Sequence, residues 1–492
     1  MNVLLIYPEC PDTFWSFKYA LKFLRKKAGS LPLGLLTVAA MLPKEWNKRL
    51  VDLQVTKLTD KDLAWADMAM VSAMAIQLES AKRVIARCRK AGVRIVAGGP
   101  LFTVEPGLFP EVDHLVLNEA EVTLPAFLAD LERGCPKHVY TSAEFAPMAH
   151  TPVPLLELAD LRQYGWMTVQ YSRGCPFRCD FCNVTSLFGH RLRSKSSAQV
   201  LAELDALYRL GWRGNIFFAD DNFIGNRQRL KADLLPALIQ WQRGKGIPFH
   251  TQVSINLADD EELMRLMVEA GFHMVFVGIE TPSADALAEC NKKQNEGRDL
   301  VADVKRLQHA GLHVQGGFII GFDTDTPSIF QRQIDFIQSS GVVMAMVGLL
   351  QAVPGTGLYD RLRREGRVTE RLSSGDNVDG TTNIVTRMGE ERLREGYRRV
   401  LRHIYAPRHY YRRIKTFLRE YRKPPITEKV RAEHVWAFLR SSIRLGILSR
   451  ERWQYWRLLV WTWFRRRELF PLAVSLAICG YHFRRTAEQH VR

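Results

Sequence analysis

The 492-residue sequence lacks most of the features that define specialised protein classes. Its eight cysteines are too sparse for a disulfide scaffold, and its start, MNVLLIYPEC, has neither the basic segment nor the cleavage site of a signal peptide. A composition of 47% hydrophobic and 25% charged residues excludes disordered, collagenous and polytopic membrane proteins. The sequence therefore predicts a globular, cytoplasmic protein of two or three domains.

Long apolar runs are also missing. Two runs near the C-terminus, 458–464 and 469–483, are separated by Arg465-Arg466-Arg467-Glu468, and neither reaches the roughly 20 residues that span a bilayer. Five of the 11 tryptophans lie in this part of the chain. Tryptophan and arginine beside apolar runs suit a helix lying in a membrane interface, or a helical cap with its arginines in water. Both interpretations stay open.

The excess of positive over negative charge lies entirely in the last fifth of the chain. Residues 387–492 hold 26 Lys and Arg against nine Asp and Glu, which accounts for the whole net charge of +17. The protein is therefore a neutral body with a basic appendage, which either contacts something anionic or is solvated.

The N-terminal part alternates short apolar runs with helical stretches such as 78–91. This rhythm predicts a doubly wound parallel sheet, whose ligands bind beyond the carboxyl ends of the strands. Gly98-Gly99-Pro100 follows one predicted strand, where a plain turn is an equal explanation. The predicted strands are 3–7, 50–53, 68–72, 94–97 and 114–117.

A second βα series follows a segment rich in proline and acidic residues, 146–160. Its helices include 197–210, with a capping box at Ser196 and Gln199, and 327–339. Six units are too few for an eight-stranded barrel and predict an open, partial one. The predicted strands are 167–171, 215–219, 250–255, 274–279, 314–322 and 344–350.

Three cysteines with the spacing C-x3-C-x2-C, Cys175, Cys179 and Cys182, follow the first strand of this second series. Thiolates hold iron–sulfur clusters, and three of them on a four-iron cluster leave one iron open to substrate or cofactor. Structural zinc needs a second pair of ligands, but the other cysteines are single, and a disulfide is disfavoured by the odd number. The motif predicts a [4Fe–4S] cluster.

This motif, together with Asp220-Asp221-Asn222 and the stretches 278–282, 317–322 and 354–356, resembles the cobalamin (B12)-dependent branch of the radical S-adenosylmethionine (SAM) superfamily. Within that branch it is most similar to the group that holds the hopanoid C-2 methylase. The resemblance covers about residues 1–365. It implies an α/β fold with a Rossmann-like cobalamin-binding domain (1–145), a linker (146–165), a radical SAM partial TIM barrel, (β/α)6 (166–375), and a basic, aromatic-rich helical region (376–492).

The resemblance implies roles for residues around the cysteines. Cys175, Cys179 and Cys182 would ligate the cluster, whose open iron binds the amino and carboxylate groups of SAM, and Phe181 would pack near the adenine. Many relatives bond the SAM amino group with a Gly-Gly-Glu motif, but this chain has Asp220 and Asp221 there. Either carboxylate suits an ammonium group, and the other would only cap the turn.

Residues at the ends of later strands are assigned to SAM in the same way. Ser254 and Asn256 fall where relatives contact the ribose. Glu280 would accept from a ribose hydroxyl or from a barrel arginine, and a purely structural salt bridge is an equal alternative. Gly317 and Gly321 match the glycine-rich strand that lets adenine approach the backbone closely.

For cobalamin, the resemblance implies that Ser72, Gly98 and Gly99 receive the dimethylbenzimidazole tail. The chain lacks the Asp-x-His-x-x-Gly signature that supplies a lower histidine ligand, and His114 is better explained as a strand residue. We therefore expect methylcobalamin bound base-off, without a histidine ligand. A degenerate domain that no longer binds cobalamin stays open, because these motifs are weak alone.

The implied function is C-methylation of an unactivated carbon. A 5′-deoxyadenosyl radical from SAM would remove a hydrogen atom, and methylcobalamin would supply the methyl group. A lipid-like, hopanoid-like or other amphiphilic substrate is expected, with ferredoxin or flavodoxin as electron donor and peripheral contact of the C-terminal region with the inner membrane surface. The alternatives are another radical SAM reaction, such as ring rearrangement or carbon–carbon bond formation, or methylation of a protein side chain or RNA. No nucleic-acid partner is expected, because no compact RNA-binding signature accompanies the charge.

Overall fold

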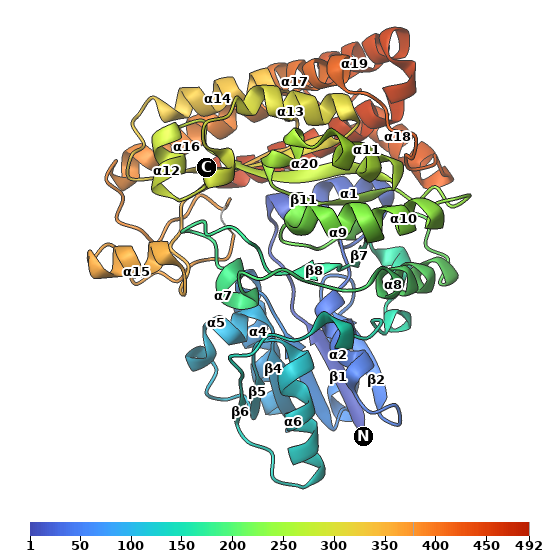
Figure 1. The fold of residues 1–492 in the computed structure, drawn as a ribbon, viewed down its shortest axis with the longest axis vertical. Coiled ribbons are helices and arrows are strands. Elements are labelled where there is room, and N and C mark those ends of the chain that lie inside the picture. The colour runs from blue at the N-terminus through green and yellow to red at the C-terminus, as the bar shows by residue number, and fades with distance from the viewer. Residues whose placement is uncertain (377, 492) are drawn as a thin grey trace.

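The computed structural model describes residues 1–376 and 378–491, arranged as two six-stranded parallel sheets and a layer of C-terminal helices (Figure 1). The N-terminal sheet has the strand order β2-β1-β3-β4-β5-β6, and every pairing in it is parallel. This confirms the doubly wound α/β fold. The strands are β1 (Asn2–Tyr7), β2 (Asn47–Asp52), β3 (Met68–Ser72), β4 (Arg94–Gly98), β5 (His114–Val116) and β6 (Val139–Tyr140).

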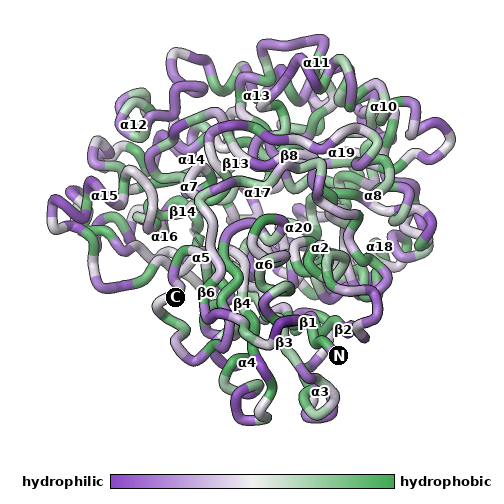
Figure 2. The backbone as a smooth tube through the Cα atoms, turned by 60° about the horizontal axis from the view of Figure 1, so that its bottom comes forward, coloured by the Kyte–Doolittle hydropathy of each residue, from purple (hydrophilic) through white to green (hydrophobic). Residues whose placement is uncertain are grey.

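Helices cover both faces of this sheet. In Figure 2, which colours the chain by the hydropathy of each residue, the central strands consist largely of hydrophobic residues. The five predicted strands are all present within a few residues, and His114 lies in β5 as expected. The sixth strand, β6, was not predicted because it is only two residues long. The helices are α2 (Leu33–Met41), α3 (Asp60–Trp65), α4 (Leu78–Lys90), α5 (Pro100–Val104) and α6 (Ala120–Glu132).

The second sheet is the predicted open barrel, with the parallel order β14-β13-β12-β11-β10-β7. A short antiparallel ribbon, β8 (Ser172–Arg173) with β9 (Arg193–Ser194), brackets the cysteine loop. The six strands are β7 (Met167–Val169), β10 (Ile216–Phe218), β11 (Phe249–Val253), β12 (Phe272–Glu280), β13 (His313–Ile320) and β14 (Ala345–Leu349).

Helices pack on one face of this second sheet. The capping box at Ser196 and Gln199 forms as predicted and begins α8. The helices of this part are α7 (Val184–Phe188), α8 (Ser197–Arg209), α9 (Arg227–Arg229), α10 (Leu235–Trp241), α11 (Glu261–Glu269), α12 (Ala284–Glu289), α13 (Leu300–Ala310), α14 (Ile329–Ser340) and α15 (Gly357–Arg364).

The opposite face of the sheet carries half-buried side chains, because burial alternates along β10 to β13. The strand register places these side chains side by side. Most are aromatic, thioether or amide groups, and His250 stacks on Phe217 at 4.8 Å between ring centroids. The residues are Phe217, His250, Gln252, Met274, Phe276 and Gln315.

The C-terminal region is helical, as predicted. It packs on the barrel through α14 and α16 and joins one large core with it. No helix within the described ranges is long and apolar enough to cross a membrane. The helices are α16 (Glu390–Tyr405), α17 (Pro407–Glu420), α18 (Ala432–Arg444), α19 (Arg452–Arg465) and α20 (Phe470–Val491).

A segment near the N-terminus leaves its own sheet and crosses to the C-terminal helices. Helix α1 (Lys18–Leu24) packs against α18 and α20, and the ring of Phe14 stacks on Tyr405. Trp15 lies edge-on against Phe276 of β12, with 5.2 Å between ring centroids. Buried side chains between residues 14 and 36 thus belong to the core of the barrel. The domain boundaries 1–145, 146–165, 166–375 and 376–492 stay predictions.

Candidate functional site

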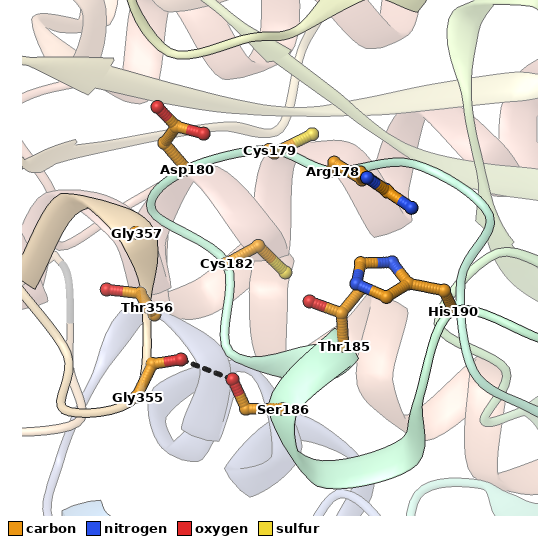
Figure 3. A pocket seen from close by; sticks show the side chains of 10 residues that line it. All are labelled: Arg178, Cys179, Asp180, Cys182, Thr185, Ser186, His190, Gly355, Thr356 and Gly357. Carbon is orange, nitrogen blue, oxygen red and sulfur yellow. Dashed lines mark hydrogen bonds between the residues drawn. The ribbon is translucent and has the colours of Figure 1, made fainter. Parts of the chain in front are cut away.

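The three predicted cluster ligands lie on one loop between β8 and α7, where the barrel sheet presents its carboxyl edge. Figure 3 shows two of them, Cys179 and Cys182. All three are free, half-buried thiols. Cys179 and Cys182 line a cavity of about 390 Å³ with Arg178, Thr185 and His190 on one side and residues 355–357 on the other. A left-handed backbone at Gly174 (φ 94°) lets the loop begin, since a Cβ there would lie 2.7 Å from the carbonyl oxygen of Arg191.

The chemistry of these thiols fits an iron–sulfur cluster. Burial raises the pKa of Cys182 to about 12, and burial is also the main cause that raises the pKa of Cys175. A coordinating iron would offset that cost, because a metal ion deprotonates its thiol ligands. No group of three Cys, His, Asp or Glu side chains in the described part of the chain is gathered tightly enough for a single metal ion. The three sulfurs need not converge on one point to hold a [4Fe–4S] cluster, because each cysteine ligates a different iron.

A segment that the sequence analysis did not single out, 290–295, holds the cysteine loop from the other side. The amide of Asp180 donates to the carbonyl of Cys290 at 3.0 Å, and the side chain of Asn291 donates to the carbonyl of Arg178 at 2.8 Å. The amide nitrogen of Gln294 lies 3.6 Å from the sulfur of Cys179. These contacts join residues more than a hundred positions apart, so no local motif could reveal them.

Within this segment Lys292 forms a buried ion pair with Glu280, at 2.7 Å between Nζ and Oε1. The ammonium group also lies 5.8 Å from the ring centroid of Phe181. Burial would lower the pKa of Lys292, but the charges of Glu280 and Cys179 outweigh it and raise the pKa above its ordinary value. Glu280 itself has a left-handed backbone (φ 64°) at the end of β12. Its partner is thus a lysine beside the cluster loop, whereas a barrel arginine was one of the expected partners.

The two neighbouring aspartates have different surroundings. Asp220 is fully buried and accepts from the amides of Tyr171 and Ser172, at 3.1 and 2.5 Å, and from the Ser172 hydroxyl at 2.5 Å. Its oxygens therefore fix the chain that leads into the cysteine loop. The charge of Asp221 is one of the smaller causes that raise the pKa of Cys175, so this carboxylate lies near the start of the cysteine loop. Burial raises the pKa of Asp221 to about 6.

The predicted ribose contacts are brought together at the end of β11. The Ser254 hydroxyl donates to Asn256 Oδ1 at 2.7 Å, and its amide donates to Asn222 Oδ1 at 3.1 Å. All three residues line a second cavity of about 410 Å³, together with Pro176 and Phe177 of the cysteine loop. The cluster loop and the end of the third barrel strand therefore open onto one space.

At Gly317 in β13 and Gly321 just after it, the space that a side chain would fill is already occupied by protein atoms. A Cβ at Gly317 would lie 2.8 Å from the ring of Phe276, and one at Gly321 would lie 3.3 Å from Leu393 of α16. Gly321 also has a left-handed backbone (φ 112°). Phe181 lies near this strand end, since its ring packs edge-on against Phe322 at 6.4 Å between centroids.

At the carboxyl edge of the N-terminal sheet, Ser72, Gly98 and Gly99 form a close-packed cradle. Ser72 pairs with Gly98 in the ladder between β3 and β4. Gly99 has a left-handed backbone (φ 91°), and a Cβ there would lie 2.7 Å from Ser72 Oγ. A Cβ at Gly98 would collide with the carbonyl oxygen of Val116 at 2.6 Å. The packing of the chain itself therefore requires glycine at both positions. All three residues are half-buried at strand ends, which is where ligands of such sheets bind.

A clamp of four buried charges joins this edge to the cysteine loop. Arg173, next to Gly174, donates to both oxygens of Glu121 at 2.8 and 3.0 Å. Arg193, after the loop, donates to both oxygens of Glu119 at 2.7 and 2.8 Å. The side chains of the glutamates are only 2–4% exposed. The carboxyl edges of the two sheets are therefore fixed face to face, which the sequence analysis did not foresee.

Comparison with known proteins agrees with this geometry. Residues 29–128 match the B12 binding domain, residues 169–337 match the Radical SAM superfamily, and residues 356–492 match a domain of unknown function, DUF4070. The chain is 39% identical to an uncharacterized methyltransferase of Synechocystis over 83% of this chain and 77% of that protein. It is 36% identical to the hopanoid C-2 methylase of Rhodopseudomonas palustris over 77% of this chain and 73% of that protein.

Among solved structures, the fold is similar to TsrM from Kitasatospora setae, a radical SAM methyltransferase with cobalamin and a [4Fe–4S] cluster bound. The TM-score is 0.58 at 17% sequence identity, over 74% of this chain and 78% of that one. The fold, the two cofactor domains and the relatives lead to the same assignment. The chain belongs to the B12-binding radical SAM methyltransferases, enzymes that use a [4Fe–4S] cluster, SAM and cobalamin.

Proposed function

We propose that this enzyme methylates an unactivated carbon of a lipid-like or other amphiphilic small molecule. The observation that carries the proposal is the clamp of Glu119, Glu121, Arg173 and Arg193, which sets the cobalamin edge of one sheet opposite the cysteine loop of the other. Fixed opposing sites suit a reaction whose two reactive groups must approach one carbon. When bound, the cluster and SAM supply the oxidant for a C–H bond, and methylcobalamin supplies the methyl group.

We assign the chain's own residues accordingly. Cys175, Cys179 and Cys182 hold the cluster, and Asp221 accepts from the SAM ammonium group. Asp220 is left a positioning role, because its two oxygens are already engaged by the backbone before the loop.

The remaining expected contacts form two sets. At the SAM site, Phe181, Gly317 and Gly321 border the adenine, Ser254 and Asn256 the ribose, and Glu280 acts through its ion pair with Lys292. At the cobalamin site, Ser72, Gly98 and Gly99 receive the cofactor tail. The cradle at Gly99 and the cavity beside Ser254 support these assignments.

The substrate class is supported by the sheet face opposite the barrel helices. Phe217, Met274 and Phe276 are half-buried there, with Trp15 packed against Phe276. The one titratable group in this set, His250, is neutral, because burial lowers its pKa to about 3. Apart from the amides of Gln252 and Gln315, this surface consists of aromatic and thioether groups and carries no charge, which favours a largely apolar molecule. The Rhodopseudomonas relative is named for a hopanoid, which agrees with this class.

Two partners complete the proposal. A ferredoxin or flavodoxin delivers the electron that reduces the cluster. The C-terminal region makes peripheral contact with the inner membrane surface, which brings the enzyme to an amphiphilic substrate. Support for this contact comes from the excess of positive charge and the exposed tryptophans of that region.

The test is anaerobic reconstitution with iron, sulfide and cobalamin, followed by incubation with SAM, a reductant and a lipid extract. We expect iron–sulfur and corrinoid absorption bands, and 5′-deoxyadenosine, S-adenosylhomocysteine and a methylated lipid formed together. Replacing Cys175, Cys179 and Cys182 by Ala should remove the cluster bands and all three products but leave the corrinoid band. Deoxyadenosine with an unmethylated product would instead indicate another radical SAM reaction and refute the proposal.

A further inference from the structure

Helices α18 and α19 and the turn between them expose an unusual number of large apolar side chains. Eleven of the 21 large hydrophobic residues exposed in the described chain fall within residues 435–464. The most exposed are Phe464 at 79% and Trp453 at 74%. We call this surface the 435–464 face: Val435, Trp436, Leu439, Ile443, Ile447, Leu448, Trp453, Trp456, Val460, Trp463 and Phe464.

The exposed residues of α19 recur at the spacing of one helix face, positions 453, 456, 460, 463 and 464. The other side of the same helix is also apolar, and there Tyr455, Leu458 and Leu459 are buried in the core. Helix α19 therefore has two apolar faces, and only one is covered in the described structure. Trp456 connects this stripe to the turn that follows α18, because its Nε1 donates to the carbonyl of Gly446 at 2.9 Å.

The charges around this face have one sign. Between residues 435 and 467 there are eight arginines and a single acid, Glu451. Glu451 is 1% exposed and is neutralised by an ion pair with Arg484, so it adds no negative charge to the surface. Two of the arginines lie over tryptophan rings, Arg452 over Trp453 at 5.9 Å and Arg467 over Trp463 at 4.5 Å to the centroids. Within residues 435–467 the exposed charges around the apolar face are thus all cationic, and Glu468, just beyond them, is paired with Arg466.

These properties select one kind of occupant. A second copy of the chain would bring the same cationic rim against its own, which like charges oppose. Single-stranded nucleic acid would use the arginines and tryptophans but not the aliphatic residues Leu439, Ile443, Ile447, Leu448 and Val460. Tryptophan, aliphatic groups and arginine together match the boundary between acyl chains and anionic headgroups. Helix α19 is too short and polar to cross a bilayer, so it would lie in that boundary.

We propose that the 435–464 face docks on the surface of an anionic phospholipid bilayer. Its tryptophans and Phe464 would enter the headgroup–acyl boundary, while Arg450, Arg452 and Arg457 contact lipid phosphates. The inference rests on the proposed function in that it specifies the membrane contact stated there. It gives the region that matches a domain of unknown function the role of a membrane-docking module.

The test is co-sedimentation of the full-length, reconstituted protein with two kinds of vesicle. One kind is phosphatidylcholine alone, and the other contains phosphatidylglycerol as well. We expect binding to the anionic vesicles that weakens as salt is raised. Replacing Trp453, Trp463 and Phe464 together by Ser should lower the partition coefficient by roughly tenfold or more at every salt concentration. Replacing Arg450, Arg452 and Arg457 by Gln should instead remove the preference for anionic vesicles.

Leu210→Ser is the matched control, because Leu210 is 45% exposed on the barrel and should leave vesicle binding unchanged. If the triple apolar variant does not fold, Phe464→Ser alone serves, and unchanged binding of that variant would overturn the proposal. The proposal would also be overturned if the wild type did not bind vesicles, or if Leu210→Ser lost as much binding as the apolar variant. It would likewise be overturned if the protein did not bind vesicles but formed a dimer or a complex with an RNA oligonucleotide that the same substitutions abolish. Vesicle binding needs no methyl transfer. Its failure with intact iron–sulfur and corrinoid bands would therefore remove the membrane contact from the proposed function but leave the proposed methylation untouched.

Discussion

Breaking the charged clamp between the two sheets at one partner should destabilise the protein by more than the loss of hydrogen bonds alone suggests, because it leaves a buried charge unpaired. In Glu121→Leu, the guanidinium of Arg173 loses both bonds to Glu121 and keeps only Gln170 at 2.9 Å and Glu119 at 3.5 Å. The side chains of Arg173 and Glu121 are 12% and 4% exposed, so water cannot replace the lost partner. Removing one member of a buried pair costs about 3–5 kcal/mol. We expect about 3 kcal/mol here, because Glu119 still neutralises part of the charge.

The assay is urea unfolding of Glu121→Leu, Arg173→Met and the double variant. The double variant should be less destabilised than the sum of the two single ones, because neither charge is then left buried alone. Arg162→Met is the matched control, since Arg162 also pairs with a carboxylate, Asp160, but is 89% exposed; its unfolding midpoint should not change. Additive single effects, each no larger than that of the control, would refute the reasoning. In the reconstituted enzyme, a loosened clamp should also raise the ratio of deoxyadenosine to methylated product.

Three further predictions follow from single side chains. Lys292→Met should weaken SAM binding and alter the change that SAM causes in the electron paramagnetic resonance spectrum of the reduced cluster. Lys292→Arg keeps the positive charge and should restore both the binding and the spectrum. The control is an equal iron content in the wild type and the two variants. Burial lowers the pKa of His313 to about 3, so this imidazole stays neutral in the folded protein but is protonated in the unfolded chain below about pH 6.5. Its contribution to the free energy of unfolding is therefore lost as the pH falls from about 6.5 towards 3. Between pH 7.5 and 5, the free energy of unfolding of His313→Leu should fall by about 2 kcal/mol less than that of the wild type. Arg413 is fully buried and donates to the carbonyls of Ile404 and Val343 and to the side chain of Gln338, with no carboxylate partner among the described residues. Arg413→Met would leave these buried acceptors without their donor. It should therefore lower the melting temperature of the protein by several degrees, and that of its His313→Leu variant by the same amount.

Much of the fold was predictable because parallel strands buried on both faces are continuous apolar runs. All eleven strands predicted from such runs are present, and the one missed strand of the two sheets, β6, pairs only through Val139 and Tyr140. The crossing of residues 14–24 to the C-terminal helices was not predictable. Phe14 and Phe23 look like ordinary core residues in the sequence, and nothing local states which core they join.

Some residues of the candidate site could likewise be named from the sequence, and others could not. The cysteine spacing and the strand-end glycines are local signals, so Cys175 to Cys182 and Ser72 with Gly98 could be named from the sequence. The different surroundings of Asp220 and Asp221 could not be predicted, because they depend on which carboxylate meets the amides of Tyr171 and Ser172 across a strand pair. Lys292 gave no signal at all, since an isolated lysine in a polar stretch is usually solvated.

The placement of the clamp also bears on how the two cofactor sites stay in register. Arg173 and Arg193 lie in β8 and β9, the two strands that bracket the cysteine loop, so the same short ribbon that shapes the loop also carries its contacts to the N-terminal sheet. A shift of that sheet would therefore pull on the loop rather than on a distant hinge. Buried bidentate pairs are directional, which permits little sliding between the two edges. A chain that must present one substrate carbon to both cofactors gains more from this rigidity than from the stability of the ion pairs themselves.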